Sequence, residues 1–108
     1  MAFSKASLYG KHERSTALIA KAIAHPTRLY ILDQLAIGPT DFAKILEDHP
    51  IAQPTLSRHL NVLRSAGLIK GQSIGMSSVY ELLCDNHPSW LVLLLKNMKA
   101  NRYYHQAA

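Results

Sequence analysis

The clearest pattern of apolar and polar positions lies in residues 53–68. Three leucines recur there at spacings of four and three residues, which places their side chains on one side of a helix: Leu56, Leu60 and Leu63. A polar set falls on or beside the opposite side: Ser57, Arg58, Asn61, Arg64 and Ser65. Pro54 suits a first helical position and Gly67 suits a helix end. We therefore predict a helix from Gln53 to Ala66 whose polar face can read a DNA major groove.

Two helices are predicted before this segment. Ser15 can cap a helix that runs through Ala24, with an apolar side formed by Leu18, Ile19, Ala22 and Ile23. The residue before a proline avoids the α region, so this helix breaks at His25 and Pro26 begins a second helix that ends at Ile37. The tetrad His25-Pro26-Thr27-Arg28 is either a site or, as we favour, a helix junction with an exposed arginine.

A third helix begins at Thr40 as its N-cap, with Asp41 in the first turn, where a negative charge suits the helix dipole. Its apolar face is formed by Phe42, Ile45 and Leu46, and it ends near Glu47-Asp48. A short connection, residues 48–52, leads into the 53–66 helix. Two helices joined in this way predict a helix-turn-helix, in which the second helix enters the groove.

Beyond Gly67 the period changes from helical to alternating. Residues 68–70 and 78–82 are predicted to be short strands, and the glycines and serines between them are turn residues. The chain therefore predicts a β-hairpin, a wing, directly after the helix-turn-helix.

The last predicted helix runs from about Pro88 to Tyr104 and carries six consecutive apolar residues, from Trp90 to Leu95. A helix that is apolar all round must be buried all round. Part of it can pack on its own domain: Leu91, Leu94, Leu95 and Met98. We predict that a second copy of the chain covers the outward side, with an interface that includes Trp90, Leu93, Leu94 and Asn97. The alternative is a monomer whose N-terminal helix covers that side.

Composition narrows the class of protein. The chain has 108 residues, a length that favours one domain. Its formal net charge of +5 and isoelectric point of about 9.6 favour a polyanionic partner. One cysteine excludes an intrachain disulfide, and the start lacks the apolar core of a signal peptide. We expect a soluble cytoplasmic protein. No enzyme is expected, because the chain lacks a nucleophile–base–acid set and a glycine-rich phosphate loop.

Two motifs together resemble those of the ArsR-type winged-helix repressors. One is Pro26-Thr27-Arg28-Leu29 followed by Ile31-Leu32, and the other is Ser57-Arg58-His59-Leu60 followed by Leu63-Arg64 and Ala66-Gly67-Leu68. The resemblance covers about residues 15–104. It implies a mainly α winged helix-turn-helix of about five helices with a small β-hairpin. It also implies a homodimeric bacterial transcription factor, usually a repressor that a ligand releases from its operator.

The resemblance also implies residues that reach bases or nearby phosphates: Gln53, Thr55, Ser57, Arg58 and His59. Helix geometry adds Asn61 and Arg64, and Thr40 at a helix N-terminus is a plausible phosphate contact. Arg58 suits a guanine edge or a phosphate, whereas Gln53 and Asn61 suit adenine. Two of these residues have structural alternatives. Thr55 can make a local hydrogen bond at the helix start, and His59 can be a packing or capping histidine.

Two departures from the family pattern concern DNA binding. The turn of the helix-turn-helix is about three residues longer than is common, through Glu47-Asp48-His49-Pro50. The wing lacks arginine and lysine between its strands, and Lys70, the only nearby positive charge, is the one charged residue there that we expect to contact DNA. Contacts from this wing to the minor groove are therefore expected to be weak, and to come from Ser, Gln and backbone N–H groups.

A third departure concerns sensing. The arsenic- and cadmium-sensing branches carry paired cysteines on the first helix of the helix-turn-helix, and residues 41–46 contain none. Asp85 and His87 fit half of the zinc-sensing pattern, but the positions expected for the other half are not ligands, and two ligands do not hold zinc tightly. We therefore favour structural roles for both: Asp85 as a hydrogen-bond acceptor at a helix start and His87 as a solvated loop residue. Cys84 is expected to be a small buried hydrophobe rather than a redox sensor. No metal or other cofactor is predicted.

The sequence therefore divides into an N-terminal segment (1–14, flexible or a short helix), a winged helix-turn-helix core (15–84), and a dimerisation helix with its tail (85–108). The leading hypothesis is a dimeric, sequence-specific regulator that binds double-stranded DNA, with an unknown inducer. The alternative is a winged-helix module that binds another protein, which the neutral wing and the long turn support. The polar face of the 53–66 helix favours DNA.

Overall fold

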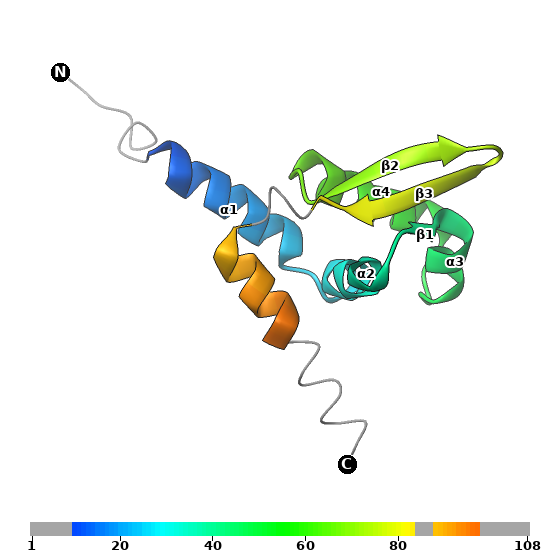
Figure 1. Cartoon of the computed structure of the whole chain (residues 1–108), viewed down its shortest axis with the longest axis horizontal. Helices are drawn as coiled ribbons and strands as arrows, with labels where there is room; N and C mark the ends of the chain where they lie inside the picture. Colours follow the sequence, from blue (N-terminus) through cyan, green and yellow to red (C-terminus); the bar gives the residue numbers. More distant parts are fainter. Residues whose placement is uncertain (1–9, 84–87, 98–108) are drawn as a thin grey trace, which may run out of the picture.

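The computed structural model describes residues 10–83 and 88–97 (Figure 1). Its elements are α1 (Lys11–Ile23), α2 (Pro26–Ile37), β1 (Thr40–Asp41), α3 (Phe42–Glu47), α4 (Gln53–Ser65), β2 (Ile69–Ile74) and β3 (Ser77–Leu82). Residues 89–97 form a further helical segment, called here the terminal segment. Five helices and an antiparallel hairpin confirm the predicted winged helix-turn-helix.

The two N-terminal helices differ in how well their starts were predicted. Helix α2 has the predicted bounds, and His25 caps it by accepting a hydrogen bond at Nδ1 from the backbone N–H of Thr27, at 3.1 Å. The predicted cap of α1 at Ser15 is wrong, because the helix begins at Lys11 after Gly10 and Ser15 lies within it. Glu13 in the first turn suits the helix dipole, which helps these polar residues to continue the helix.

The predicted N-cap of α3 is also wrong. Asp41 caps the helix, because its Oδ1 accepts the backbone N–H of Lys44 at 2.8 Å. Thr40 belongs instead to β1, where it pairs with Tyr80 and its hydroxyl donates to the carbonyl of Gly38 at 3.0 Å. A strand of two residues has no periodicity that a sequence pattern can show.

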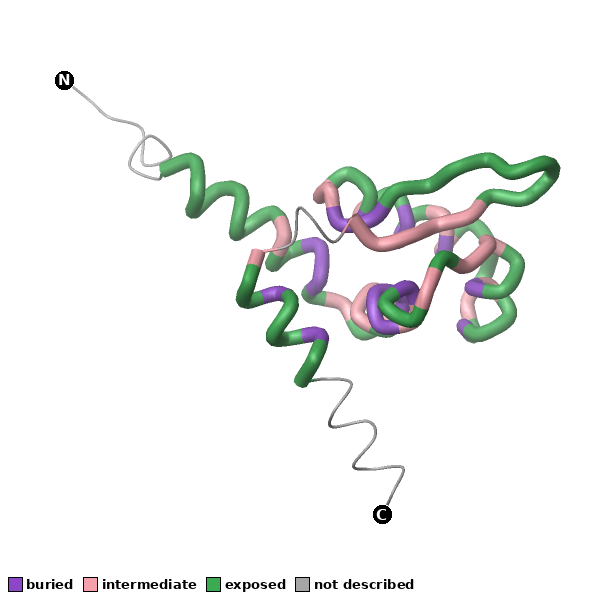
Figure 2. Tube along the Cα trace, viewed as in Figure 1, coloured by how far each residue is buried: buried purple, intermediate pink, exposed green. Residues whose placement is uncertain are grey.

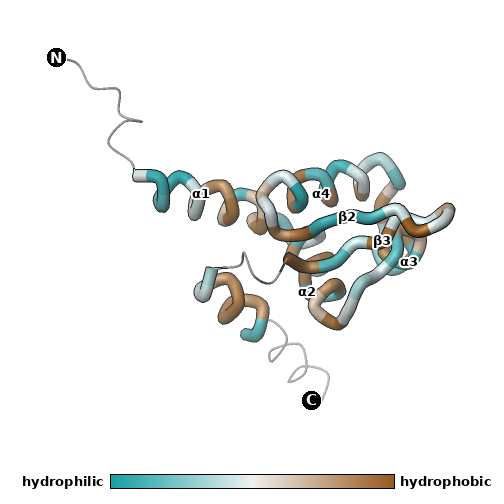
Figure 3. Tube along the Cα trace, turned by 45° about the horizontal axis from the view of Figure 1, so that its top comes forward, coloured by the Kyte–Doolittle hydropathy of each residue, from teal (hydrophilic) through white to brown (hydrophobic). Residues whose placement is uncertain are grey.

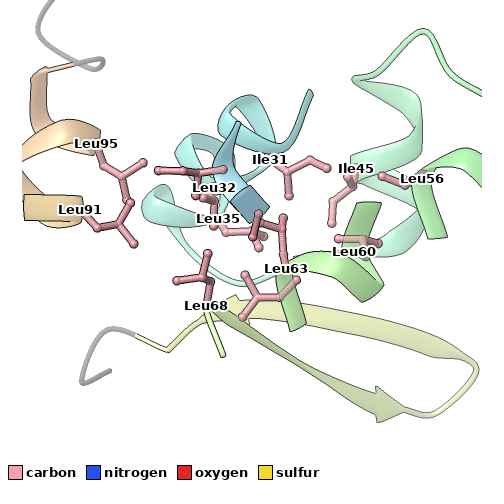
Figure 4. Packing of buried hydrophobic residues seen from close by; sticks show 13 residues of the cluster. Ile31, Leu32, Leu35, Ile45, Leu56, Leu60, Leu63, Leu68, Leu91 and Leu95 are labelled. Carbon is pink, nitrogen blue, oxygen red and sulfur yellow. The ribbon is translucent and has the colours of Figure 1, made fainter. Parts of the chain in front are cut away.

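The core lies where α2, α3 and α4 meet (Figure 4). Ile31, Leu32 and Leu35 come from α2 and Ile45 from α3. The three leucines of α4 predicted as its packed face are all buried, and this confirms that face: Leu56, Leu60 and Leu63. Gly67 follows α4 with φ of 76°, a left-handed conformation that glycine adopts without strain, and this confirms the predicted stop.

The sheet has the order β1-β3-β2, and both pairings are antiparallel. The wing strands are longer than predicted, because pairing continues to Ile74↔Ser77 and leaves only Gly75 and Met76 as the loop. Gly75 has φ of 63°, which suits the first central position of a tight hairpin turn. The outer residues of β2 are exposed on both faces, so they lack the alternation that would have shown a strand.

The terminal segment buries only part of its apolar surface. Leu91 and Leu95 point towards the core beside α2 (Figure 4). Leu94 remains 37% exposed, against the prediction that it packs on its own domain, and Met98 lies outside the described residues. The expected outward positions are exposed, as Figure 2 shows for this segment: Trp90, Leu93 and Asn97. Within the described residues, no helix is both long enough and apolar enough to cross a membrane.

Candidate nucleic-acid interface

Hydrophilic and hydrophobic residues both occur along α4 (Figure 3). Its leucines are buried, whereas its basic residues Arg58 and Arg64 are exposed, so its outer face is polar and basic. Four of the predicted contact residues are exposed on it: Gln53, Arg58, Asn61 and Arg64. Ser57 and Thr55 are half-buried at its edges. The guanidinium of Arg64 donates to Oδ1 of Asn61 at 2.9 Å, so these two side chains form one polar unit on the helix surface. Arg58 has no carboxylate partner among the described residues.

The N-terminus of α4 is open. Ala52 is the N-cap residue, and no side chain caps the helix. Its first backbone N–H groups therefore remain available to an acceptor from outside, and the helix dipole favours an anion there. Thr55 makes none of the hydrogen bonds found among the described side chains, so its predicted alternative as a local capping residue gains no support.

His59 lies on the inner side of α4 and only 8% of it is exposed. Its Nδ1 accepts a hydrogen bond from Nε of Arg28 at 3.1 Å, and its ring packs on that of His25 with centroids 4.4 Å apart. This position favours the packing alternative for His59 over a contact with DNA bases.

Arg28 connects three helices. Besides His59 on α4, its guanidinium donates to the carbonyls of Lys21 at 3.3 Å and Ala22 at 3.1 Å, near the C-terminal end of α1. The prediction that His25-Pro26-Thr27-Arg28 forms a helix junction is confirmed. The expected exposure of the arginine is wrong, because its side chain is half-buried between α1, α2 and α4. Arg28 therefore fixes the inner side of α4.

The Arg28–His59 hydrogen bond requires a neutral imidazole, since only an unprotonated Nδ1 can accept. Burial lowers the pKa of His59 from its ordinary value of 6.5, and His25, Arg28, Arg58 and His49 lower it further because each disfavours an added positive charge. The surroundings of His59 thus maintain the protonation state that the hydrogen bond needs.

The long turn between α3 and α4 spans residues 48–52, as predicted, and is held at several points. His49 is buried, its Nδ1 lies 2.7 Å from the carbonyl of Ile45, and its ring meets that of Tyr30 edge to face. Asp48 accepts from Nε2 of Gln34 at 2.8 Å and forms an ion pair with Lys44. The extra residues are therefore anchored to α2 and α3, which gives α4 a defined start.

Two predicted contacts lie away from α4. Thr40 precedes Asp41, the residue that caps α3, and its hydroxyl donates to the carbonyl of Gly38, so the reason for expecting a phosphate contact from a helix N-cap is lost. Lys70 is exposed at the base of the wing but forms an ion pair with Glu81 at 2.8 Å, and that carboxylate raises its pKa. Part of its positive charge is therefore already compensated.

A positive region that sequence reasoning missed adjoins the polar face. An open groove between α1 and α4 is lined by Lys21 of α1 and by Arg58 and Asn61 of α4, together with apolar side chains such as Leu18 and Val62. No acidic residue lines it. Lys21 and Arg58 are 37 positions apart in the chain, so no local pattern could have joined them.

The structure does not test the predictions made for the candidate sensing residues. Cys84, Asp85 and His87 lie outside the described residues. Among residues 10–83 and 88–97, no group of three or more His, Cys, Asp or Glu side chains is arranged to hold a metal ion.

Comparisons with known proteins bear on both the fold and this interface. A model of the bacterial regulatory proteins of the arsR family matches residues 25–70. The chain is 41% identical over 76 residues to an uncharacterized HTH-type transcriptional regulator from Methanocaldococcus jannaschii, which covers 69% of this chain and 84% of that protein. It is 39% identical over 64 residues to the transcriptional repressor SdpR of Bacillus subtilis, covering 59% of this chain and 71% of that one.

Among solved structures, the chain resembles the homodimeric winged helix-turn-helix DNA-binding domain Mb0332 from Mycobacterium bovis, a possible ArsR-family transcriptional regulator. The TM-score is 0.68 at 25% identity, and the match covers 98% of this chain and 91% of that domain. Across several further curated relatives the chain spans a smaller share of their length, from 55% to 66%.

Proposed function

The chain belongs to the ArsR family of bacterial regulatory proteins, and we propose on that premise that it is a dimeric, sequence-specific repressor of transcription whose helix α4 enters the major groove of DNA. The observation that carries the proposal is the polar face of α4. Its exposed side chains can donate to base edges or phosphates, while buried leucines and Arg28 hold its other side. A rigidly held helix can keep the same side chains in register with the same bases.

We divide the contacts by their chemistry. Arg58 and Arg64 are proposed to bind guanine edges or phosphates, and Gln53 and Asn61 to bind adenine. Ser57 and the uncapped N-terminus of α4, with Thr55 beside it, are proposed to bind phosphate. His59 and Thr40 are left out of this set, because His59 is buried against Arg28 and Thr40 is paired in β1.

The proposed dimer rests on the terminal segment. Four neighbouring apolar side chains are between 36% and 60% exposed there: Trp90, Val92, Leu93 and Leu94. An apolar group of this size is rarely left bare on a soluble monomer. The homodimer formed by the Mycobacterium bovis domain supports a second copy as the partner. A twofold dimer would present two α4 helices to half-sites about one DNA turn apart.

The repressor assignment is supported by a relative, because SdpR of Bacillus subtilis is a transcriptional repressor. Binding to chromosomal DNA would place the chain in the cytoplasm, in a regulatory rather than an enzymatic role.

Selection of duplexes from a random pool at physiological salt tests the proposal. We expect enrichment of a palindromic motif with half-sites about 10 base pairs apart. To test the proposed contact face, the Arg58→Ala variant is measured on the selected duplex. It should bind about 5- to 150-fold more weakly, which corresponds to about 1–3 kcal/mol, without a change in helix content. Failure of the wild-type chain to enrich any motif would instead favour the protein-binding alternative, which the uncharged wing supports.

A further inference from the structure

The groove between α1 and α4 has an apolar lining as well as the positive charges described above. The C-terminal half of α1 lies beside α4 there (Figure 3). Leu18 of α1 and Val62 of α4 line the groove, and Leu18 is 65% exposed. The groove has a volume of about 410 Å³. Small-molecule sites commonly enclose about 300–1,000 Å³, so a small ligand with an apolar body fits this space.

Three cationic side chains line the same groove, one from each of three helices: Lys21, Arg28 and Arg58. None of them takes part in an ion pair among residues 10–83 and 88–97, and no acidic side chain lines the groove. A cleft lined by charges of one sign raises the local concentration of the opposite ion. The charge of the groove therefore favours an anion as its ligand.

The hydrogen-bonding groups left over in the groove are donors. Oδ1 of Asn61 already accepts from Arg64, so the NH2 group of this amide is what remains for a ligand. Nε and Nη1 of Arg28 are bonded within the chain, whereas its Nη2 makes none of the hydrogen bonds found among the described residues. Lysine and arginine can only donate. A carboxylate, which only accepts and matches the fork of a guanidinium, is the complementary head group.

We propose that this groove binds a small, free carboxylate with an apolar chain, and that its binding lowers the affinity of α4 for DNA. The second half of the inference rests on the proposed function. The head group lies against Lys21 and Arg58, and the chain lies along Leu18 and Val62. A DNA phosphate would satisfy the charges but leave Leu18 in water, which favours an amphiphilic ligand. No described residue of the terminal segment lines the groove, so it is separate from the proposed dimer surface.

Two residues belong both to the groove and to the face proposed to meet DNA, namely Arg58 and Asn61. A guanidinium that is paired with a carboxylate is not free to bind a guanine edge or a phosphate. The bound anion also adds a negative charge beside the face of α4 that approaches a polyanion. Coupling between two ligands is reciprocal and typically amounts to about 5- to 150-fold in affinity. The carboxylate and DNA should therefore weaken each other's binding by the same factor.

The site is tested first without DNA, by isothermal titration calorimetry of the full chain with sodium octanoate. We expect saturable binding of one octanoate per chain. Acetate, which lacks the chain, and octanol, which lacks the charge, should each bind at least about tenfold more weakly. Lys21→Gln should weaken octanoate binding about tenfold and Leu18→Asn about fivefold, with unchanged helix content. Lys11→Gln removes an exposed charge from the same helix outside the groove and should leave octanoate binding unchanged.

The coupling is tested next, by fluorescence anisotropy of the selected duplex at physiological salt. Saturating octanoate should lower the duplex affinity of the wild-type chain about tenfold. Leu18→Asn should bind the duplex as the wild type does, but should need about five times more octanoate for the same loss. Acetate at the same concentration serves as the control for ionic strength and should not release the duplex.

The possible failures are distinguishable. Absence of octanoate binding would overturn the site and leave the proposed function of α4 intact, and so would binding that both groove variants retain, since the carboxylate would then lie elsewhere. If Lys21→Gln weakened duplex binding and octanoate did not bind, the groove would belong to the DNA interface. Octanoate binding with no effect on the duplex would overturn the coupling. A chain that binds octanoate in the groove but no duplex would overturn the coupling together with the proposed function.

Discussion

Helix α4 and the terminal segment are both rich in leucine, but they bury it very differently. The leucines of α4 are spaced three or four residues apart, and all three are at most 1% exposed. Those of the terminal segment are almost consecutive, and Leu93 and Leu94 remain 60% and 37% exposed. A helix has one side towards its own core, so consecutive leucines cannot all reach it.

Within one chain, the leucines of α4 contribute to folding, whereas those of the terminal segment leave apolar surface for assembly. Spaced leucines complete a helix inside the domain and leave its polar side free for a ligand. Consecutive leucines leave an apolar side that only another surface can cover. The helix proposed to bind DNA is thus stabilised within each chain, while the element proposed to pair two chains is incomplete alone.

The largest effect is expected from Leu63→Ala. Removing this fully buried side chain leaves a cavity, and the free energy of unfolding should fall by about 2–5 kcal/mol. Leu93→Ala removes the same atoms from an exposed site and should cost less than about 1 kcal/mol at concentrations where the chain is monomeric. Urea unfolding measures both. Equal losses would show that the two helices are not buried differently.

Leu93→Glu should separate assembly from folding more directly. A carboxylate in the proposed interface would be buried without a partner, so the dimer dissociation constant should rise about 100-fold, or by about 3 kcal/mol, while helix content stays the same. Sedimentation over a range of concentrations measures the change. Lys96→Gln alters the net charge equally at an exposed polar position and should remain dimeric. A Leu93→Glu dimer of wild-type affinity would exclude this interface.

The smallest effect is expected from His59→Asn, measured as a function of pH. The pKa of His59 is lowered in the folded chain, so the unfolded chain binds a proton first as the pH falls below 6.5. The contribution of His59 to stability is therefore complete above pH 6.5 and is lost as the pH falls through its lower folded value. Asparagine can accept the Arg28 hydrogen bond but does not titrate.

The His59→Asn variant should accordingly lose less stability than the wild type between pH 7 and pH 5, in urea unfolding at each pH. If the stability of the variant and of the wild type changed identically with pH, the titration of His59 would not contribute to the pH dependence of folding.

The sequence predicted best those features that depend on neighbours three or four residues apart. The bounds of α2, the leucine face of α4 and the glycine after it follow from local periodicity and backbone preference. The start of α1 was misplaced, because Ser15 is as good a cap as any residue before it and nothing local shows that the helix continues back to Lys11.

Contacts between distant segments could not be predicted. The burial of His59 depends on Arg28, which lies 31 residues earlier, and helix spacing alone places His59 at the edge of either face. The proximity of Lys21 to Arg58 and the pairing of Thr40 with Tyr80 likewise arise only when the chain is folded. The residues proposed to meet DNA remain predictions, because exposure shows only which of them are accessible.

The hydrogen bond between Arg28 and His59 also sets limits on redesign. Gln53, Asn61 and Arg64 are exposed, so they can be varied to change operator preference without disturbing the core. His59 sits among these positions in the sequence, yet its ring packs against Arg28 and His25, so a library that randomises it varies the packing between helices rather than the outer face of α4. A side chain at 59 is expected to be tolerated where it can still accept the Arg28 hydrogen bond, as asparagine can.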